Sequence, residues 1–423
     1  SAPMFQQIGS KAYKPGLETT HQLDEHFGHP HQQFKTIHIA GTNGKGSCSH
    51  TIAAVLQSAG YRVGLFTSPH LVDFRERIRI NGEMMPEEYV VNFVEEHRSF
   101  FEPLHPSFFE LTTAMAFRYF ADQKVDVAVI EVGMGGRLDC TNIIRPDLCL
   151  ITNIGLDHTQ YLGGTLEKIA EEKAGIIKKG VPVFFDGSDE RSSRVIEETA
   201  ENVEAPWYKM EKDALKIQEI TDKHIAFSIL DEYDNNTVWQ VASTGIYQVM
   251  NAALAIRAMR YTFGDKAEIC KWQKVVASVK WQGRMEEVLP GVIFDGAHNL
   301  AAIREFTKSI RLQREAEGEI HPLIILFSAV ADKDYSHMIE LLCRESKADA
   351  YVIAKVDNKR GAQADTLAAL FRKYTDRPVY REDTLADAFT RALNEKGSEG
   401  KLYCLGSLYL VGELKELIGG EDA

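Results

Sequence analysis

Glycines, a lysine and a hydroxyl residue follow a β-forming stretch near the N-terminus. Strand-like residues Thr36 to Ala40 lead into Gly41-Thr42-Asn43-Gly44-Lys45-Gly46-Ser47, which opens a helical pattern. Glycines let backbone N–H groups face a phosphate, a helix start adds positive potential, Lys45 adds a point charge, and the Ser47 hydroxyl can bind Mg²⁺. The spacing departs from the usual phosphate loop, because Gly46 separates Lys45 from Ser47. We predict a nucleoside triphosphate site; the alternative is a glycine-rich turn without a ligand.

Two further candidate residues lie at or just beyond the ends of predicted strands. Glu131 ends an apolar stretch just before a run of glycines, and His158 follows another such stretch by a few residues. A carboxylate in this position is costly unless it is exposed, paired or bound to a metal. Because α/β sheets place ligands at the carboxyl ends of their strands, we expect Ser47, Ser68, Glu131 and His158 to converge on the triphosphate. Taken singly, each can also be a solvated loop residue.

The elements that position these residues alternate between strand and helix. The predicted strands are Lys35–Ala40, Tyr61–Phe66, Val125–Val132, Asp147–Asn153 and Val181–Phe185. The predicted helices between them are Gly46–Ala59, Pro86–Phe101, Phe108–Gln123 and Thr165–Lys178. This alternation indicates a mostly parallel sheet covered on both faces, so the fold class is α/β.

An antiparallel hairpin and a second α/β domain are predicted after this sheet. The hairpin pairs His224–Leu230 with Thr237–Ala242 across a polar turn, and helices over Tyr247–Phe263 and Asp265–Val279 follow. Five more strands, each followed by a helix, form a smaller Rossmann-like domain. These strands are Val292–Asp295, Leu323–Phe327, Tyr351–Lys355, Val379–Arg381 and Lys401–Leu405. We place the domains at residues 1–282 and 283–423, with a ligand cleft expected at their junction.

Composition excludes several classes of protein. The chain has 423 residues and a formal net charge of −13, which disfavours binding to nucleic acid or to an anionic membrane. Its six cysteines form no C-x-x-C pair, and its longest apolar stretch is about half of the ~18 residues that span a membrane. We expect a cytoplasmic monomer with small-molecule substrates. Because the sequence begins with Ser1, we also expect the N-terminus to have been trimmed or to begin late.

Seven motifs in the same order resemble the folylpolyglutamate synthase and dihydrofolate synthase family of the Mur ligase superfamily. They are Gly41–Ser47, Thr67–Leu71, Glu131–Asp139, Leu156–Thr159, Glu172–Ile176, Asp295–Asn299 and Gly406–Leu408. Members of this family use ATP to phosphorylate a carboxylate, and the amine of L-glutamate then attacks the acyl phosphate to form an amide. The resemblance implies an ATP-dependent ligase that acts on folate, on dihydropteroate or on both.

The resemblance also implies roles for residues around the triphosphate. Ser68, Glu131 and His158 would bind two Mg²⁺ ions with Ser47 beside the first, and Lys45, Lys173 and His158 would be catalytic. Lys173 matches a family lysine that is carbamylated, which would make it an anionic metal ligand. The alternative for Lys173 is a helix-surface lysine paired with neighbouring acids.

Further roles follow from the same resemblance. ATP would contact the loop Thr42, Asn43, Gly44, Lys45, Gly46 and Ser47, together with Asn251, Arg284, Asp295 and His298. We expect the domains to close about a hinge near Gly283 and exclude water from the acyl phosphate.

Phe109 would stack on the pterin, with a buried helix start as the alternative. Arg137 and Asp139 match the form found in bifunctional bacterial members that also act on dihydropteroate.

Two other functions remain open at this point. One is a Mur-type ligase acting on a UDP-linked peptidoglycan precursor, and the other is a non-catalytic nucleotide-binding switch.

A further cluster, His21, His26, His29 and His31, matches no tetrahedral zinc spacing and lies in a polar segment. We expect these histidines to belong to a solvated helix and loop.

Overall fold

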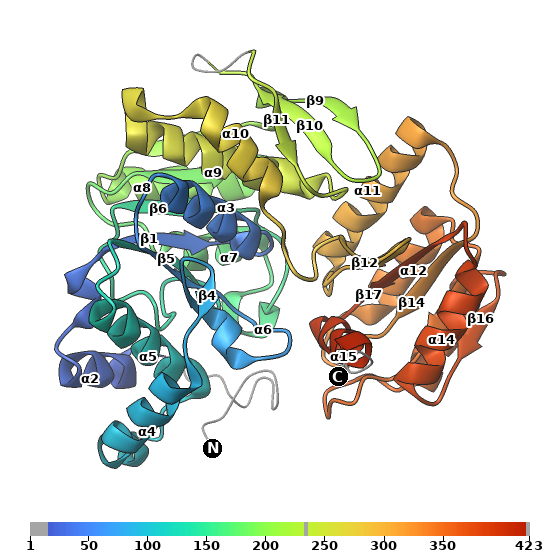
Figure 1. Ribbon diagram of the computed structural model, residues 1–423, viewed down its shortest axis with the longest axis horizontal. Helices are drawn as coiled ribbons and strands as arrows, with labels where there is room; N and C mark the ends of the chain where they lie inside the picture. Colours follow the sequence, from blue (N-terminus) through green and yellow to red (C-terminus); the bar gives the residue numbers. More distant parts are fainter. Residues whose placement is uncertain (1–15, 232–235, 420–423) are drawn as a thin grey trace. The chain divides into compact units, whose positions relative to one another are not determined.

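The computed structural model describes residues 16–231 and 236–419 of the chain (Figure 1). It divides into two compact units, and each is described by itself. The first unit holds the described residues up to Lys216, those of 227–240, and Gln248–Val279. The second unit holds Ile217–Ala226, Val241–Tyr247 and the described residues from Lys280 onward.

An eight-stranded sheet forms the centre of the first unit, in the order β4-β3-β2-β5-β1-β6-β7-β8. The strands are β1 (Lys35–Ala40), β2 (Val63–Phe66), β3 (Ile78–Ile80), β4 (Glu83–Met84), β5 (Val127–Glu131), β6 (Leu148–Ile151), β7 (Val183–Asp186) and β8 (Trp207–Met210). β1 pairs in parallel with β5 and β6, and the ladder continues in parallel through β2, β7 and β8. β3 and β4 add an antiparallel edge. The predicted mostly parallel sheet is confirmed; β3, β4 and β8 were not predicted, because they are short and offer little apolar pattern.

Both faces of this sheet are buried, which is why its strands read as continuous apolar runs. The register places His38 beside Ile130 and Cys149 on one face, and Ile37 beside Val129 and Leu148 on the other. All of these side chains are buried. The strands therefore hold their carboxyl ends rigidly at one edge, where the loops that follow β1 and β5 begin.

Helices cover the sheet between these strands. They are α2 (Glu18–His26), α3 (Lys45–Ser58), α4 (Glu87–Phe101), α5 (Phe108–Asp122), α6 (Thr159–Leu162), α7 (Leu166–Ala174), α8 (Glu190–Asn202), α9 (Tyr247–Phe263) and α10 (Ile269–Ser278). Short 3-10 helices are η2 (Pro30–Gln33), η3 (Phe74–Arg77), η4 (Glu102–Leu104), η5 (Lys212–Ala214) and η6 (Gly264–Lys266). α7 is shorter than the predicted Thr165–Lys178: Gly175 is its C-terminal cap, and the Glu172 carbonyl of its last turn accepts the backbone N–H of Arg137.

A separate three-stranded sheet has the order β11-β10-β9. β10 (Ile225–Ile229) and β11 (Trp239–Val241) lie at the two predicted hairpin strands, while residues 232–235 of the predicted turn are outside the described residues. β9 (Leu215–Ile220) was not predicted, because its side chains are mostly exposed and carry little apolar signal.

The second unit is built on a six-stranded sheet with the order β12-β13-β17-β14-β15-β16. The strands are β12 (Glu286–Leu289), β13 (Val292–Phe294), β14 (Leu323–Phe327), β15 (Ala350–Ile353), β16 (Val379–Arg381) and β17 (Lys401–Leu405). The helices are α11 (Leu300–Glu317), α12 (Tyr335–Ser346), α13 (Ala364–Tyr374), α14 (Leu385–Lys396) and α15 (Leu408–Gly419). All pairings from β13 to β16 are parallel, and β12 is antiparallel to β13. The five predicted strand-helix pairs are confirmed, and β12 is an unpredicted edge strand.

Within the described chain, no helix combines the length and the apolar character needed to cross a bilayer. All six cysteines are free thiols, and Cys48, Cys149 and Cys404 are buried.

Candidate active site

The glycine-rich loop connects the end of β1 to the first turn of α3. Gly41 and Gly44 both have positive φ values, of 146° and 85°. A Cβ on Gly41 would collide with the Thr152 side chain, and a Cβ on Gly44 would collide with the amide of Asn251. Both positions therefore require glycine. Asn251 of α9 lies against Gly44 of this loop.

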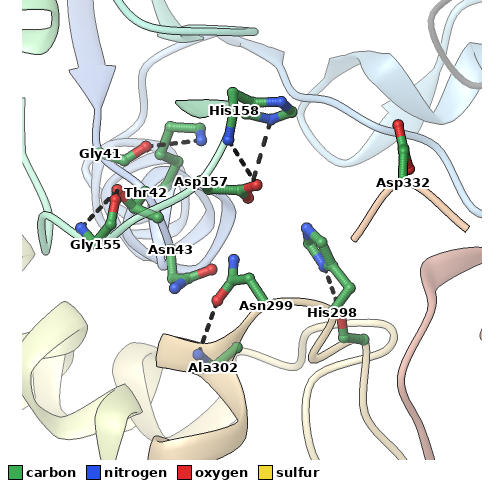
Figure 2. Close-up of polar contacts among 12 residues, drawn as sticks. Gly41, Thr42, Asn43, Gly155, Asp157, His158, His298, Asn299, Ala302 and Asp332 are labelled. Carbon is green, nitrogen blue, oxygen red and sulfur yellow. Dashed lines mark hydrogen bonds and ion pairs between the residues drawn. The ribbon is translucent and has the colours of Figure 1, made fainter. Parts of the chain in front are cut away.

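Residues after β6 hold the loop in place. Thr42 donates its backbone N–H to the Asn153 carbonyl at 2.8 Å, and Asn43 donates its own to the Asn153 side-chain oxygen at 2.8 Å. The Thr152 hydroxyl donates to the Asn43 carbonyl at 2.6 Å. Thr42 is also hydrogen-bonded through its hydroxyl to both backbone groups of Gly155 (Figure 2). The loop is thus preorganised by a neighbouring strand end, which the sequence motif by itself does not reveal.

Two lysine ammonium groups meet at one carbonyl oxygen of this loop. Lys45 Nζ lies 2.9 Å and Lys173 Nζ lies 3.0 Å from the Gly41 oxygen. Lys173 is buried, so the alternative of a helix-surface lysine is wrong. Burial, together with the nearby Lys45 ammonium, lowers the pKa of Lys173 to about 7, against the opposing charges of Asp157 and Asp139. This amine is therefore partly neutral near neutral pH.

Hydroxyl and carboxylate groups suited to a hard cation lie beside the loop. The Ser47 hydroxyl, in the first turn of α3, is buried and has no hydrogen-bond partner in the described part of the chain. Glu131, the last residue of β5, is buried, and its Oε2 accepts the backbone N–H of Ser68 at 3.3 Å. The same oxygen lies 3.8 Å from the position of a Cβ on Gly46. An unsatisfied hydroxyl and a buried carboxylate fit a magnesium ion, whose preferred ligands are oxygens.

His158 lies next to Asp157, just before α6. Its backbone is left-handed, with φ 49°, and its Nε2 is 4.0 Å from Asp157 Oδ2. The backbone N–H of His158 donates to Asp157 Oδ1 at 2.9 Å (Figure 2). Asp157 was not predicted as a site residue, although it adjoins His158 and its charge acts on Lys173. The adjacent Asp-His pair was the signal that could have identified it.

The residues predicted to bind the pterin do not form one group. Phe109 stacks on Phe66 with ring centroids 5.8 Å apart, and both Phe109 and Asp139 lie against Gly133. Arg137 forms an ion pair with Glu172 at 2.9 Å, and its side chain is 57% exposed. The structure therefore brings Phe109 and Asp139 together, while Arg137 is directed to α7.

Asp139 is occupied by hydrogen bonds from the loop around it. Its Oδ1 accepts from the backbone N–H groups of Gly133 and Met134, and its Oδ2 accepts from the backbone and hydroxyl of Thr141. The buried His38 in turn lies 2.8 Å from the Thr141 hydroxyl. Burial raises the pKa of Asp139 and these hydrogen bonds oppose the rise. The carboxylate thus shapes the glycine run after β5, a role that the residue type alone could not specify.

Arg284, Asp295 and His298 gather around Gly296 in the second unit. A Cβ on Gly296 would collide with the Arg284 guanidinium, and His298 Nδ1 lies 2.8 Å from the Gly296 carbonyl (Figure 2). The buried Asp295 accepts hydrogen bonds from the Tyr247 hydroxyl at 2.9 Å and from the backbone of Met285 and Ala297. Burial raises the pKa of Asp295, while the Arg284 charge opposes this. Asp295 therefore orders the segment that carries His298.

Comparisons with known proteins agree with this arrangement. Residues 39–259 match the Mur ligase middle domain, and residues 283–408 match the Mur ligase, glutamate ligase domain. The chain is 36% identical over 417 residues to a dihydrofolate synthase/folylpolyglutamate synthase of Bacillus subtilis (strain 168), covering 95% of both chains. It is 31% identical to a folylpolyglutamate synthase of Lacticaseibacillus casei, covering 93% of this chain and 92% of that one.

Solved structures show the same relationship. The E. coli FolC structure in complex with DHPP and ADP has a TM-score of 0.85 and 30% identity, covering 98% of this chain and 95% of that one. The Mycobacterium tuberculosis folylpolyglutamate synthase complexed with ADP and AMPPCP has a TM-score of 0.84 and 28% identity, covering 96% of both chains. From its motifs, fold and relatives, the chain belongs to the folylpolyglutamate synthase/dihydrofolate synthase family of Mur ligases.

Proposed function

We propose that this ATP-dependent ligase joins L-glutamate to folate, to dihydropteroate or to both, through an acyl phosphate. The observation that carries the proposal is the meeting of the Lys45 and Lys173 amines at the Gly41 carbonyl, in a loop with positive φ values at Gly41 and Gly44. This loop provides cationic groups and backbone N–H groups for a triphosphate. The Lys45 ammonium would stabilise charge that builds up on the transferred phosphoryl group.

Two Mg²⁺ ions belong to this proposal, with Ser47, Ser68, Glu131, His158 and Lys173 as the residues that would hold them. The fit is best for Ser47, because its buried hydroxyl is unsatisfied among the described residues. When bound, the ions would neutralise phosphate charge and orient the reacting oxygens. Thr42, Asn43, Gly44, Gly46 and Asn251 would contact ATP from the first unit. Arg284, Asp295 and His298 remain proposed nucleotide contacts of the second.

Carbamylation of Lys173 is supported by its surroundings. A neutral amine is the form that adds CO₂, and the lowered pKa of Lys173 supplies that form near pH 7. The new N–C bond releases one proton and leaves an N–H that can still donate to the Gly41 carbonyl. The product is an anion beside the Lys45 ammonium, so a repulsion between two cations becomes an attraction.

The pterin would lie near Phe109 and Asp139, with Arg137 as a more distant contact. We further propose the domain boundary at residue 283, a monomeric state and a cytoplasmic location. The six free thiols support a reducing compartment.

A substrate panel tests the proposed activity. ADP release should require L-glutamate together with dihydropteroate or a reduced folate, and mass analysis should find the product one glutamate heavier than the acceptor. Turnover with UDP-linked peptidoglycan precursors in place of both pterin substrates would assign the chain to the other Mur-type activity. ADP release that ignores every acceptor would contradict ligation.

A further inference from the structure

Outside the proposed active site, a carboxylate and two imidazoles converge within eight residues of the chain. Asp24 of α2, His29 and His31 place one ligand atom each within 4.8 Å of one another. His29 Nδ1 lies 2.6 Å from Asp24 Oδ2, and His31 Nε2 lies 3.2 Å from the same carboxylate. His21, His26 and His29 are exposed as expected, but His31 is buried together with Asp24, so the expectation of a solvated segment is wrong at His31. That expectation considered only the histidines and missed the carboxylate.

The backbone fixes these three residues in place. The His29 N–H donates to the Asp24 carbonyl at 2.9 Å, which closes the end of α2. His29 has a left-handed φ of 53°, and Pro30 then starts η2, so the chain reverses and returns the His31 ring to Asp24. Figure 1 shows α2 beside α5. η2 also packs on α5, and the centre of the His31 ring lies 5.9 Å from that of the Phe117 ring. The site is therefore held by the fold and does not depend on exposed side chains finding one another.

One oxygen of the buried carboxylate is unsatisfied. Asp24 Oδ1 accepts no hydrogen bond from any described residue, although His31 Nε2 lies 3.2 Å away. A buried anionic oxygen in this condition is costly unless a cation or water completes it. Within the part of the chain that the structure describes, Asp24 Oδ1 therefore remains available to a cation.

We propose that Asp24, His29 and His31 form a site for a divalent transition-metal ion of the zinc class. Two imidazoles and a carboxylate are a ligand set that zinc accepts, and neighbouring ligand atoms around tetrahedral zinc are about 3.3 Å apart. The two nitrogen–carboxylate separations are 2.6 and 3.2 Å, and all three ligand atoms lie within 4.8 Å of one another, so side-chain movements of about 1 to 2 Å would reach that value. The His29 side chain is 49% exposed, which gives the ion an entry path and leaves a fourth position to water.

The ion would tie the end of α2 to η2, which leads directly into β1. Its role is therefore to stabilise the fold of the first unit, and it takes no part in the ligase chemistry. The proposal is independent of the proposed function, because β1 carries the phosphate loop at its opposite end.

Metal titration of the full chain tests the site. Chelator-treated protein is titrated with Zn²⁺ while millimolar Mg²⁺ occupies oxygen-rich sites, and bound zinc is measured by equilibrium dialysis. We expect the wild type to bind zinc with an accompanying rise in Tm of roughly 2–5 °C at saturation. His29→Ala should weaken this binding at least tenfold and abolish the rise; its half-exposed side chain makes misfolding of the variant a minor concern. His21→Ala, at an exposed position of α2, is the matched control and should bind like the wild type.

Spectroscopy identifies the ligands. Co²⁺ substitution should give the visible absorption of a nitrogen- and oxygen-ligated tetrahedral ion, lost in both His29→Ala and Asp24→Asn. Unchanged zinc affinity in these two variants, or thiolate charge-transfer bands that place the ion on cysteines, would overturn the proposal. A wild-type chain that retains no zinc at about 0.1 mM Zn²⁺ would overturn it as well, because that limit is weaker than the zinc sites that proteins use.

Discussion

The two lysines at the Gly41 carbonyl show how a residue's chemistry depends on its neighbours. Lys45 and Lys173 are far apart in sequence, yet both ammonium groups donate to one oxygen. In the folded chain the pKa of Lys173 falls from 10.5 to about 7. The unfolded chain thus holds a proton that the folded chain lacks between these values. The lowered pKa of Lys173 therefore reduces the free energy of unfolding. This reduction is full below about pH 7, becomes smaller as the pH rises from 7 to 10.5, and is absent above 10.5.

Carbamylation of Lys173 should be observable directly. With ¹³C-labelled bicarbonate, the wild type should show a carbamate resonance that grows as the pH rises through about 7, since the neutral amine is the reactive form. Lys173→Arg should lose the resonance, while Lys168→Arg, at an exposed position of the same helix, should retain it. A wild-type spectrum without a carbamate at pH 8 would contradict the proposal.

Lys45→Ala should reduce turnover by about two orders of magnitude or more, because it removes a cation from the developing phosphoryl charge. ADP release measures turnover, and circular dichroism checks that the fold is retained. The same change should raise the pKa of Lys173, because the Lys45 charge helps to lower it. Lys35→Ala, at an exposed residue of β1, is the control. Turnover like that of the wild type in Lys45→Ala would refute the assignment of the loop.

At the scale of elements, the loop between β1 and α3 depends on strand β6 and helix α9. Thr152 and Asn153 after β6 bind the loop backbone, and Asn251 of α9 lies against Gly44. Gly44→Ala should therefore raise the KM for ATP at least tenfold, because the new methyl group displaces the Asn251 amide. Gly60→Ala is the matched control: Gly60 also has a positive φ, of 92°, but an added Cβ there would have no atom within 4 Å. It should cost only about 1–2 kcal/mol of stability and leave the KM for ATP unchanged. Equal KM values for the two variants would show that the contact with Asn251 is unimportant.

At the scale of the whole molecule, the chain carries its candidate groups in two units of α/β structure. An acyl phosphate needs protection from water, so we expect closure about the segment near Gly283 when ATP and a pterin substrate are both present. Small-angle X-ray scattering should then give a smaller radius of gyration than for the free protein. Identical scattering in the free and ligand-bound states would argue against closure.

The two alternating α/β patterns, the glycine-rich loop and the family could be predicted from the residues alone, because they depend on local periodicity and on the order of short motifs. The sequence also placed Glu131 correctly at the end of a strand, since an apolar run followed by glycines marks that point. Exposed edge strands such as β9 escaped prediction, because they bury too little apolar surface to leave a pattern.

Contacts between residues far apart in the chain could not be predicted in this way. The tertiary structure brought Lys173 from α7 to the loop after β1, directed Arg137 to Glu172, and turned Asp139 into an acceptor for its own loop. It likewise joined Asp24 to His29 and His31. Burial and nearby charges set the pKa of each group, and its neighbours determine which hydrogen bonds it can make. Burial, charges and neighbours all depend on contacts between segments that the order of residues in the chain does not specify.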